Sequence, residues 1–547
     1  MQQPSRVLGQ LLLKEGRISS QQLSTALLEQ QSTRERLGEI LTRGGTDPEI
    51  IARALAEQLR LPYAAAPLLP HRDVLKLVDR NTAMRLRIVP LATHEKALRI
   101  AMSDPLDIVA IDDLQFKTGR RVEPVVASPR SVEQALAAYD TTEVATLIAR
   151  IPTVTSSAHN DDELRRASEA PPVVALLDHL LVRAAAARAS DIHVEPGPER
   201  LCVRIRVDGV MRELLTLPVS IAPSLTSRIK VIANLDISIR RKPQDGRCSF
   251  VSNTTEYAAR VSTLPTQFGE KIVLRLLAST TAPTTLPDLG MSVSMLQQFR
   301  GMLKRHHGVI LVTGPTGSGK SSTLYAALGE LDARARNIVT LEDPIERRME
   351  GITQVQVNRR GGTSFAQALR AVLRQDPDII LIGELRDRET VETAFAAALT
   401  GHLVLATLHT NDTATAATRL IEMGAPPYLI CGALVGVLAQ RLVRRLCPKC
   451  RGKANDGSNQ FVAMGCVTCD HVGYRGRVGI FELAGMSMEW RDLIMKRAPA
   501  DAFRIAGKNA KVTFLADDAF QKATAGDTSY AEVDSLLLMD RVQVIAG

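Results

Sequence analysis

The chain has 547 residues, and at roughly 150 residues per domain this length predicts three or four domains. Hydrophobic residues make up 45% of the chain and aromatic residues 3%, which excludes a wholly disordered or fibrous protein and argues against a surface that stacks single-stranded bases. The net charge of +9 favours acidic partners such as nucleotides or anionic membrane without identifying one.

The N-terminal region contains an internal repeat within residues 6–60. Val7-Leu8-Gly9 precedes Gly16 in the first copy, and Arg36-Leu37-Gly38 precedes Gly45 in the second, at an offset of 29 residues. Each copy predicts a short amphipathic helix, a glycine turn and a second helix. The simplest interpretation is a pair of helical hairpins that pack on each other.

A mixed α/β pattern follows in residues 61–140, where Leu98–Met102 alternates like a strand. Together with the repeat it forms a predicted N-terminal regulatory or docking domain, residues 1–140. Residues 141–170 contain Thr and Ser runs and a polar stretch, which predicts a linker.

A small α/β domain is predicted for residues 171–285. Pro171-Pro172 begins a helix with one apolar face. Along Leu201–Asp208 apolar residues alternate with polar ones that include Arg204 and Arg206, as in a half-buried strand. Further strands are predicted at Tyr257–Val261 and Ile272–Leu277.

Short buried strands alternate with helices between about residues 290 and 445. Continuous apolar runs of this kind are typical of a parallel sheet covered on both faces. The predicted strands are Val309–Thr313, Ile338–Leu341, Ile379–Ile382 and Leu403–Leu408. At the end of the chain, residues 480–547 predict helices.

A phosphate-binding loop follows the first of these strands, because residues 314–321 match the pattern GxxxxGK[ST] completely. Its glycines let backbone N–H groups wrap around phosphates, Lys320 can reach the β- and γ-phosphates, and Ser321 can ligate Mg²⁺. The strand before the loop and the helix after it supply the expected context for ATP. The predicted nucleotide-binding residues are Gly314, Pro315, Thr316, Gly317, Ser318, Gly319, Lys320, Ser321 and Ser322.

Acidic and polar side chains follow the other strands, at the sheet edge where α/β proteins bind ligands. Glu342, Glu384 and His409 each stand at or just after a strand end. Glu384 is expected to polarise the attacking water or to hold Mg²⁺ through water, with Glu342 in the other role. His409 fits a γ-phosphate sensor. The sequence leaves the division of roles between the two glutamates open.

Two CxxC pairs lie near the C-terminus, with fifteen residues between them. Two thiolates from each pair suit tetrahedral Zn²⁺, and four Cys ligands leave no position for water, so the metal is expected to be structural. Buried inert thiols and a dithiol switch are the alternatives. The predicted ligands, in a module at residues 447–469, are Cys447, Cys450, Cys466 and Cys469.

Cysteine usage and hydropathy bear on the compartment. Seven cysteines in a chain of this length form no disulfide framework, and a thiol metal site indicates a reducing compartment. No apolar run reaches the roughly 18 residues of a membrane-spanning helix. We therefore expect a cytoplasmic protein whose contact with the membrane is peripheral.

At these motifs the chain resembles the secretion ATPases that drive type II secretion and type IV pilus assembly. The matching stretches are Ala189–Pro196, Pro243–Arg247, Leu341–Glu346, Leu373–Asp387, Thr400–Asp412 and Ala439–Arg444. The resemblance implies a RecA-like ATPase domain over residues 286–547, ATP bound between it and the small domain, and a homo-oligomer that forms a hexameric ring. The family's assembly motors carry a cysteine module that its retraction motors lack, which favours assembly or secretion.

The resemblance also implies arginines that reach the γ-phosphate across domains or subunits. Arg204, Arg206 and Arg228 lie in the small domain, within residues 171–480 over which the resemblance extends, and Arg441 lies in the last of the matching stretches. Arginine is always charged and is shaped for phosphate oxygens. A solvated position or an ordinary salt bridge is an equal alternative for each of them, and Asp208 is available to pair with Arg204 or Arg206.

The N-terminal repeat resembles the tandem cyclic di-GMP-binding motif found at the start of some members of this family. The second copy fits through Arg36, Leu37, Gly38 and Gly45, whereas Val7 stands where the first copy should have Arg. Docking to a membrane-anchored platform protein is the competing use of this region.

The predicted fold is therefore multidomain α/β, with a RecA-like P-loop core, a small α/β domain before it, a helical and α+β N-terminal domain and a zinc-binding insertion near the C-terminus. The predicted function is a cytoplasmic ring ATPase that assembles a pilus or pseudopilus, bound peripherally at the inner membrane through platform and docking proteins. A DNA translocase or conjugation motor is one alternative, but the basic track beside the cysteine module is short, so no direct nucleic-acid contact is expected. A nucleotide-gated scaffold with negligible turnover is the other.

Overall fold

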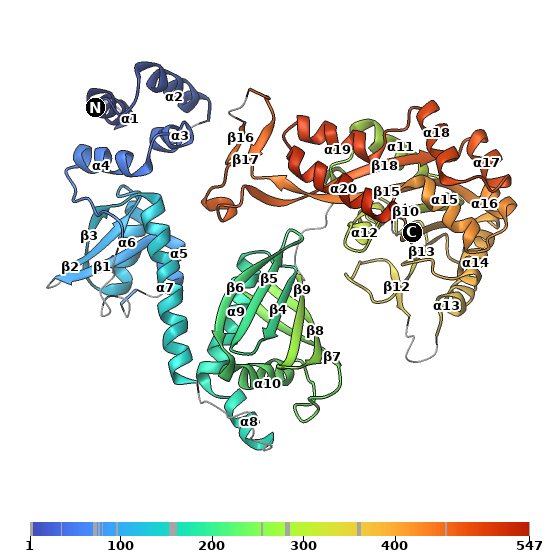
Figure 1. The fold of residues 1–547 in the computed structure, drawn as a ribbon, viewed down its shortest axis with the longest axis horizontal. Helices are drawn as coiled ribbons and strands as arrows, with labels where there is room; N and C mark the ends of the chain where they lie inside the picture. Colours follow the sequence, from blue (N-terminus) through green and yellow to red (C-terminus); the bar gives the residue numbers. More distant parts are fainter. Residues whose placement is uncertain are drawn as a thin grey trace. The chain divides into compact units, whose positions relative to one another are not determined.

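The chain forms two compact units, residues 1–180 with 217–231 and residues 181–216 with 232–547. None of the described helices combines the length and the hydrophobicity that crossing a membrane requires. The computed structural model (Figure 1) describes residues 4–545 apart from 34, 69–73, 75–76, 79, 95–96, 152–160, 253–254, 279–284, 358–362 and 455–456.

The first unit begins with two helical hairpins, which confirms the predicted repeat. Gly16 and Gly45 have φ of 67° and 92°, left-handed values that suit glycine at the turn inside each hairpin. Leu12, Leu37 and Ile40 are among the buried residues of the core that the hairpins share. The four helices are α1 (Pro4–Lys14), α2 (Ser20–Thr33), α3 (Leu37–Arg43) and α4 (Pro48–Leu59).

A three-stranded sheet with helices follows, as the mixed α/β pattern predicts. β2 lies in the middle, antiparallel to β1 and parallel to β3. Apolar residues such as Ile88, Ile100 and Leu114 form its core. The elements are α5 (Arg80–Leu86), β1 (Ile88–His94), β2 (Ala97–Met102), α6 (Ile108–Thr118), β3 (Arg121–Val126) and α7 (Pro129–Arg150).

The predicted linker, residues 141–170, contains the last turns of α7 and all of α8 (Asp161–Ser168), while residues 152–160 lie outside the described part. The first unit also includes η1 (Val219–Ile221) and nearly all of α10 (Ala222–Ile232). The predicted domain boundaries assign these two elements to the small domain instead.

The second unit contains a six-stranded sheet in the order β6-β5-β4-β9-β8-β7. In the chain it follows α9 (Pro171–Ala186), of which residues 171–180 belong to the first unit. Its alternation is clear in β5, where Leu201, Val203 and Ile205 are buried between half-buried Arg204 and Arg206. The strands are β4 (Asp191–Pro196), β5 (Arg200–Val207), β6 (Val210–Pro218), β7 (Gln244–Ser252), β8 (Thr255–Thr266) and β9 (Gly269–Ala278).

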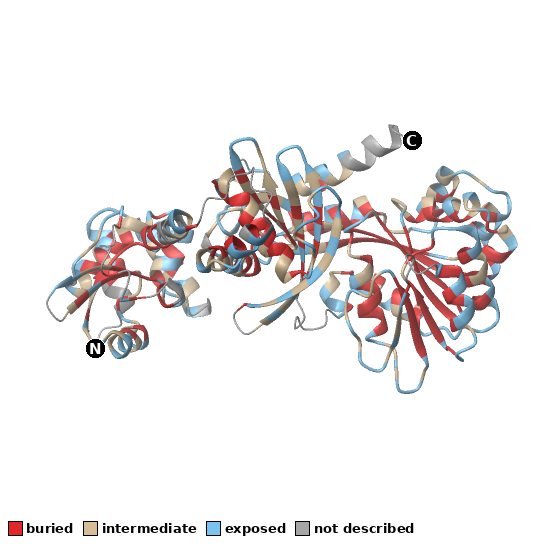
Figure 2. Cartoon of the chain, turned by 90° about the horizontal axis from the view of Figure 1, so that it is seen from below, coloured by how far each residue is buried: buried red, intermediate tan, exposed pale blue. Residues whose placement is uncertain are grey.

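A seven-stranded sheet in the order β12-β11-β13-β14-β10-β15-β18 carries the P-loop, and the four predicted strands of this region are confirmed as β10, β11, β13 and β14. All of their residues are buried, and Figure 2 shows these strands in red between paler helices and loops. The elements up to the cysteine module are η2 (Pro287–Leu289), α11 (Val293–Leu303), β10 (Gly308–Thr313), α12 (Lys320–Leu328), β11 (Ile338–Glu342), β12 (Thr353–Gln356), α13 (Phe365–Val372), β13 (Ile379–Ile382), α14 (Arg388–Leu399), β14 (Leu403–Leu408), α15 (Thr413–Glu422), α16 (Pro427–Ala433) and β15 (Leu434–Leu446).

The prediction that residues 480–547 are helical is wrong for residues 480–485. These residues end β18, which pairs antiparallel with β15 at the edge of the sheet. Residues 479–484 of β18 are buried or nearly so on both faces, so no period of two marks them as a strand. The remaining elements are β16 (Arg451–Lys453), β17 (Phe461–Ala463), η4 (Val467–Cys469), β18 (Tyr474–Gly485), α17 (Met488–Met495), α18 (Ala500–Asn509), α19 (Leu515–Thr524) and α20 (Tyr530–Ile545).

Candidate active site

The P-loop joins the end of β10 to the start of α12, and its conformation requires glycine. Gly314 has φ 152°, and a Cβ there would lie 2.4 Å from the carbonyl oxygen of Gln440. Gly319 caps α12 with a left-handed φ of 89°. Among the described residues, the buried Ser318 hydroxyl has no hydrogen-bond partner. A loop of this shape at a helix N-terminus fits a phosphate group.

Lys320 turns back onto this loop. Its amine donates to the carbonyl oxygens of Gly314 at 2.6 Å and Pro315 at 3.0 Å. Burial, followed by repulsion from Arg441, lowers the pKa of Lys320 to about 8, and attraction from Glu384 opposes the shift. The charged form of this buried amine would therefore gain from the negative charge of an incoming phosphate.

Glu384 and His409 lie together beside Lys320, at the ends of neighbouring strands β13 and β14. Glu384 Oε2 is 3.5 Å from His409 Nε2, and Glu384 Oε1 pairs with Arg386. Burial, and then repulsion from Lys320, lowers the pKa of His409. Its imidazole is therefore neutral at pH 7, and one ring nitrogen can donate a hydrogen bond.

Glu342, at the end of β11, is held by neighbours that the sequence did not identify. Its Oε1 accepts from the hydroxyl of Thr340 at 2.6 Å and from Gln354 Nε2 at 3.1 Å, and its Oε2 accepts from the Tyr325 hydroxyl. Burial, with the neighbouring Glu342 next, raises the pKa of Tyr325. Tyr325 belongs to the apolar face of α12, where no sequence signal separates it from an ordinary core residue.

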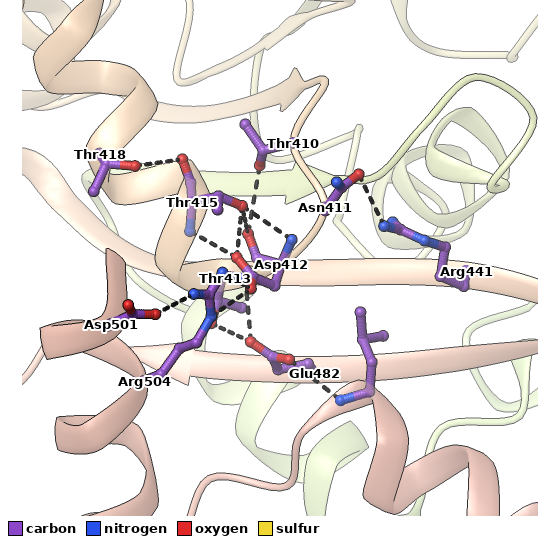
Figure 3. Close-up of polar contacts among 11 residues, drawn as sticks. Thr410, Asn411, Asp412, Thr413, Thr415, Thr418, Arg441, Glu482, Asp501 and Arg504 are labelled. Carbon is purple, nitrogen blue, oxygen red and sulfur yellow. Dashed lines mark hydrogen bonds and ion pairs between the residues drawn. The ribbon is translucent and has the colours of Figure 1, made fainter. Parts of the chain in front are cut away.

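The middle of β15, on the side of β10 away from β14, supports the P-loop. Gln440 Oε1 accepts from the Thr323 hydroxyl of α12 at 2.6 Å. Arg441, 5% exposed, donates from Nη2 to Asn411 Oδ1 at 3.1 Å (Figure 3). Of the four predicted arginines, Arg441 therefore lies among the site residues of the P-loop domain. Gln440 stands beside it in a stretch that matched the family, which was its only sequence signal.

Arg204 and Arg206 are engaged within the six-stranded sheet. Arg204 donates two hydrogen bonds to Glu195, from Nε at 2.7 Å and Nη2 at 3.0 Å. Arg206 Nε lies 3.9 Å from Asp191 Oδ2, and its Nη1 donates to Gly209 O at 2.8 Å.

Asp208, which was available to pair with one of these arginines, has another partner. Asp208 follows the end of β5 with a φ of 50°, and its Oδ2 accepts from the backbone N–H of Gly476 at 2.8 Å. The carboxylates on β4 take its place, because β4 is the hydrogen-bonded neighbour of β5. Arg228 lies on α10, in the first unit.

The structure brings the four predicted metal ligands together, since all four sulfurs lie within 4.8 Å of one another. The distances between Sγ atoms are 3.9 Å for Cys447 and Cys466, 3.7 Å for Cys450 and Cys469, and 3.8 Å for Cys466 and Cys469. Tetrahedral Zn–S bonds of about 2.3 Å place their sulfurs about 3.8 Å apart. Three of the sulfur pairs therefore have the spacing of a tetrahedral zinc site.

A cavity of about 1110 Å³ in the first unit is lined by the helical repeat and by the loop after β2. Arg36, Leu37 and Gly38 of the second repeat copy line it. Arg36 Nη1 lies 2.5 Å from Asp104 Oδ2, so an ion pair joins two of its walls. The Val7 side chain lies outside the described part of the structure.

The chain is similar to known proteins over nearly its whole length. The model of the family "Type II/IV secretion system protein" matches residues 166–535, and that of the "MshEN domain" matches residues 59–146. Type IV pilus assembly ATPase PilB of Myxococcus xanthus is 40% identical over 98% of this chain and 99% of that protein. Type II secretion system protein E of Pseudomonas aeruginosa is 40% identical over 86% of this chain and 98% of that protein. The Legionella pneumophila ATPase DotB shares the fold, with a TM-score of 0.53 and 24% identity over 66% of this chain and 95% of that chain.

Proposed function

Because the chain belongs to the family of type II/IV secretion system proteins, we propose that the site around Lys320 is the centre at which it hydrolyses ATP. The chain is an ATPase of the kind that drives protein secretion or pilus assembly. The convergence of a P-loop, Glu384 and His409 at the carboxyl edge of one parallel sheet carries the proposal.

The residues divide the work according to their surroundings. Lys320 and the backbone N–H groups of the loop hold the phosphates, and Ser321 supplies a hydroxyl ligand for Mg²⁺, which would balance phosphate charge. Glu384, beside Lys320 and His409, orients and polarises the attacking water. Glu342 keeps its three hydrogen bonds and acts as a fixed acceptor at the same edge. His409, as a neutral donor, contacts the γ-phosphate.

The two glutamates can be separated by paired variants. Glu384→Gln keeps the side-chain shape but loses the base, so hydrolysis should fall by about 100-fold or more while ATP still binds. Glu342→Gln keeps an acceptor for Thr340 and should retain more activity than Glu384→Gln. Steady-state hydrolysis and binding of a fluorescent ATP analogue measure both. If Glu342→Gln is the weaker enzyme, the assigned roles are reversed.

The working form in this proposal is a hexameric ring in which Arg204, Arg206 and Arg228 act from outside the P-loop domain. Lys320 and Arg441 are cations of that domain at the site, while Arg386 is paired with Glu384, and further positive charge would stabilise the charge that develops on the γ-phosphate. The ring works at the cytoplasmic face of the inner membrane with platform and docking proteins. The relatives' names refer to secretion and pilus assembly, which favours this function over DNA translocation.

We also propose that the four cysteines of the module at residues 447–469 would hold one structural Zn²⁺. Besides the sulfur spacing, the backbone N–H groups of Cys466 and Gly473 each donate to Cys469 Sγ at 3.2 Å, as they would to a metal-bound thiolate. Elemental analysis should find about one zinc per chain. Cys450→Ser should lose the metal and Cys202→Ser should keep it. Purified wild-type protein with four free thiols and no zinc would refute the site.

The cavity of the first unit is a second candidate site, for cyclic di-GMP. Its supporting observation is that Arg36, Leu37 and Gly38, the residues that fit the motif, line one cavity large enough for a dinucleotide. Calorimetry should detect binding that Arg36→Ala weakens strongly, because a guanidinium can stack on guanine or bind phosphate. Arg17→Ala, at an exposed position of the same repeat, is the matched control. Equal binding by both variants would exclude this use of Arg36.

A further inference from the structure

The loop after β14 and the start of α15 are anchored to α18 and β18, two elements that follow the cysteine module. This loop, residues 409–412, contains His409 and leads into α15, which begins at Thr413. Thr410 is held by Thr313, whose hydroxyl accepts from the Thr410 N–H at 3.0 Å, and Asn411 is held by Arg441. The next two residues contact α18 and β18, as Figure 3 shows.

Asp412 uses its two carboxylate oxygens for different purposes. Oδ1 caps α15, accepting from the N–H of Thr415 at 2.7 Å and from its hydroxyl at 2.5 Å. Oδ2 accepts from Arg504 of α18, from Nε at 3.0 Å and Nη2 at 2.8 Å. A cap needs only the first oxygen, so the paired bonds to Arg504 serve another purpose.

Glu482 holds the first residue of α15 in place. This residue of β18 is 2% exposed, and its Oε1 accepts from both the N–H and the hydroxyl of Thr413. Its Oε2 accepts from the N–H of Leu515 at the start of α19, 3.2 Å away. Thr413, the residue after Asp412, is therefore fixed to β18.

We propose that Arg504 is a positioning residue for ATP hydrolysis, acting through Asp412 on the loop that carries His409 and Asn411. The inference rests on the proposed role of His409. Consecutive loop residues contact Glu384, Thr313, Arg441 and Arg504, so a shift at Asp412 also moves His409 relative to Glu384. Catalytic geometry tolerates little of such movement, because misplacement by about 1 Å can cost 100-fold in rate.

The exposure of the pair separates a positioning role from a merely structural one. The Arg504 side chain is 40% exposed and that of Asp412 20%. Ion pairs this close to solvent contribute little to folding stability. Loss of Arg504 should therefore lower turnover without a matching loss of stability or of ATP binding.

The test compares full-length Arg504→Gln with wild type at protein concentrations where assembly is complete. The kcat should fall by about 10-fold to 100-fold, while KM, melting temperature and binding of a fluorescent ATP analogue stay near wild type. Arg504→Lys, which restores one donor and the charge, should recover part of the rate. With Asp412→Asn in addition, Arg504→Gln should cost almost nothing further, because the two act as a unit.

The matched control is Lys508→Gln, which removes one positive charge from an exposed position of the same helix. It should keep the wild-type rate. The inference is overturned if Arg504→Gln keeps its kcat, if its loss follows melting temperature, or if Lys508→Gln loses as much.

His409→Ala separates a failure of the proposed role of His409 from a failure of the inference about Arg504. If His409→Ala hydrolyses ATP normally, the proposed role of His409 fails, and the inference about Arg504 fails with it. If His409→Ala is inactive but Arg504→Gln is not impaired, only the inference about Arg504 fails.

Discussion

The two sheets of the second unit hold their positive charges in opposite ways. In the seven-stranded sheet, burial and Arg441 lower the pKa of Lys320, so this site gains from an anion that brings negative charge. In the six-stranded sheet, Arg204 is already bound by Glu195, and its hydrogen bonds, against the effect of burial, help to lower the pKa of that carboxyl to about 2. One sheet therefore presents a cationic site prepared for phosphate, whereas the other keeps its arginines neutralised until something displaces their carboxylates.

The largest expected effect comes from removing Lys320, the P-loop cation of the seven-stranded sheet. Lys320→Ala should lower hydrolysis by about 100-fold or more, because the amine contacts charge that develops on the phosphates. Burial disfavours the charged form of Lys320, so its loss should not weaken the fold and the melting temperature should stay near wild type. Steady-state ATPase assays measure the loss, with Lys304→Ala, an exposed lysine of the same domain, as the control. Undiminished turnover in Lys320→Ala would remove the site assignment.

Mixing two inactive variants tests whether Arg206 of the six-stranded sheet reaches the P-loop site across a subunit boundary. Arg206→Ala and Lys320→Ala should each be inactive alone. In randomly mixed rings about a quarter of the sites would combine an intact P-loop with an intact neighbouring arginine, so activity should partly return. The control mixes Lys320→Ala with the double variant Arg206→Ala/Lys320→Ala. This mixture contains no intact P-loop and should stay inactive.

Continued inactivity of the mixture, while each protein assembles and binds ATP, would mean that Arg206 acts within its own chain or not at all. Hydrolysis by a proven monomer would contradict the ring itself.

The cationic character of the P-loop site makes ATP binding depend on pH. The pKa of Lys320 is about 8 in the free chain, and bound phosphate raises it, so above pH 8 binding must take up a proton. Affinity should fall by up to about tenfold per pH unit as the pH rises further. Calorimetry at pH 9 in buffers of different ionisation enthalpy measures the proton uptake. Lys320→Ala should lose this contribution; equal uptake by both proteins would show that another group titrates.

The smallest expected effect is the loss of stability when the ion pairs of the six-stranded sheet are broken. The pKa of Glu195 lies below its ordinary 4.5, so the pairs add stability above pH 4.5 that is lost as the pH falls toward 2. Because the Arg204 side chain is 41% exposed, Glu195→Gln should cost only about 0–1 kcal/mol at pH 7. Urea unfolding of wild type and of Glu195→Gln at pH 7 and at pH 3 measures the free energy of unfolding under each condition. A larger loss at pH 7 would show that Glu195 supports the fold.

Most of the fold and part of the site could be predicted because their signals are local. The P-loop is eight consecutive residues whose backbone forms the binding surface, so its pattern is complete in the sequence. The buried strands are continuous apolar runs, and Glu384 and His409 follow strands that a parallel sheet must bring to one edge. β18 escaped prediction because its pairing with β15 spans the whole cysteine module.

The sequence by itself determined which groups are present: the P-loop, the acids at strand ends, the four cysteines and the two helical hairpins. Only the tertiary structure decided which of these groups contact one another. Tyr325 and Gln354 close on Glu342, and Arg504 reaches Asp412 across 92 positions of the chain. Such partners depend on strand order and on how the helices pack, and a charged or hydroxyl side chain has the same local pattern whether it faces solvent or a carboxylate.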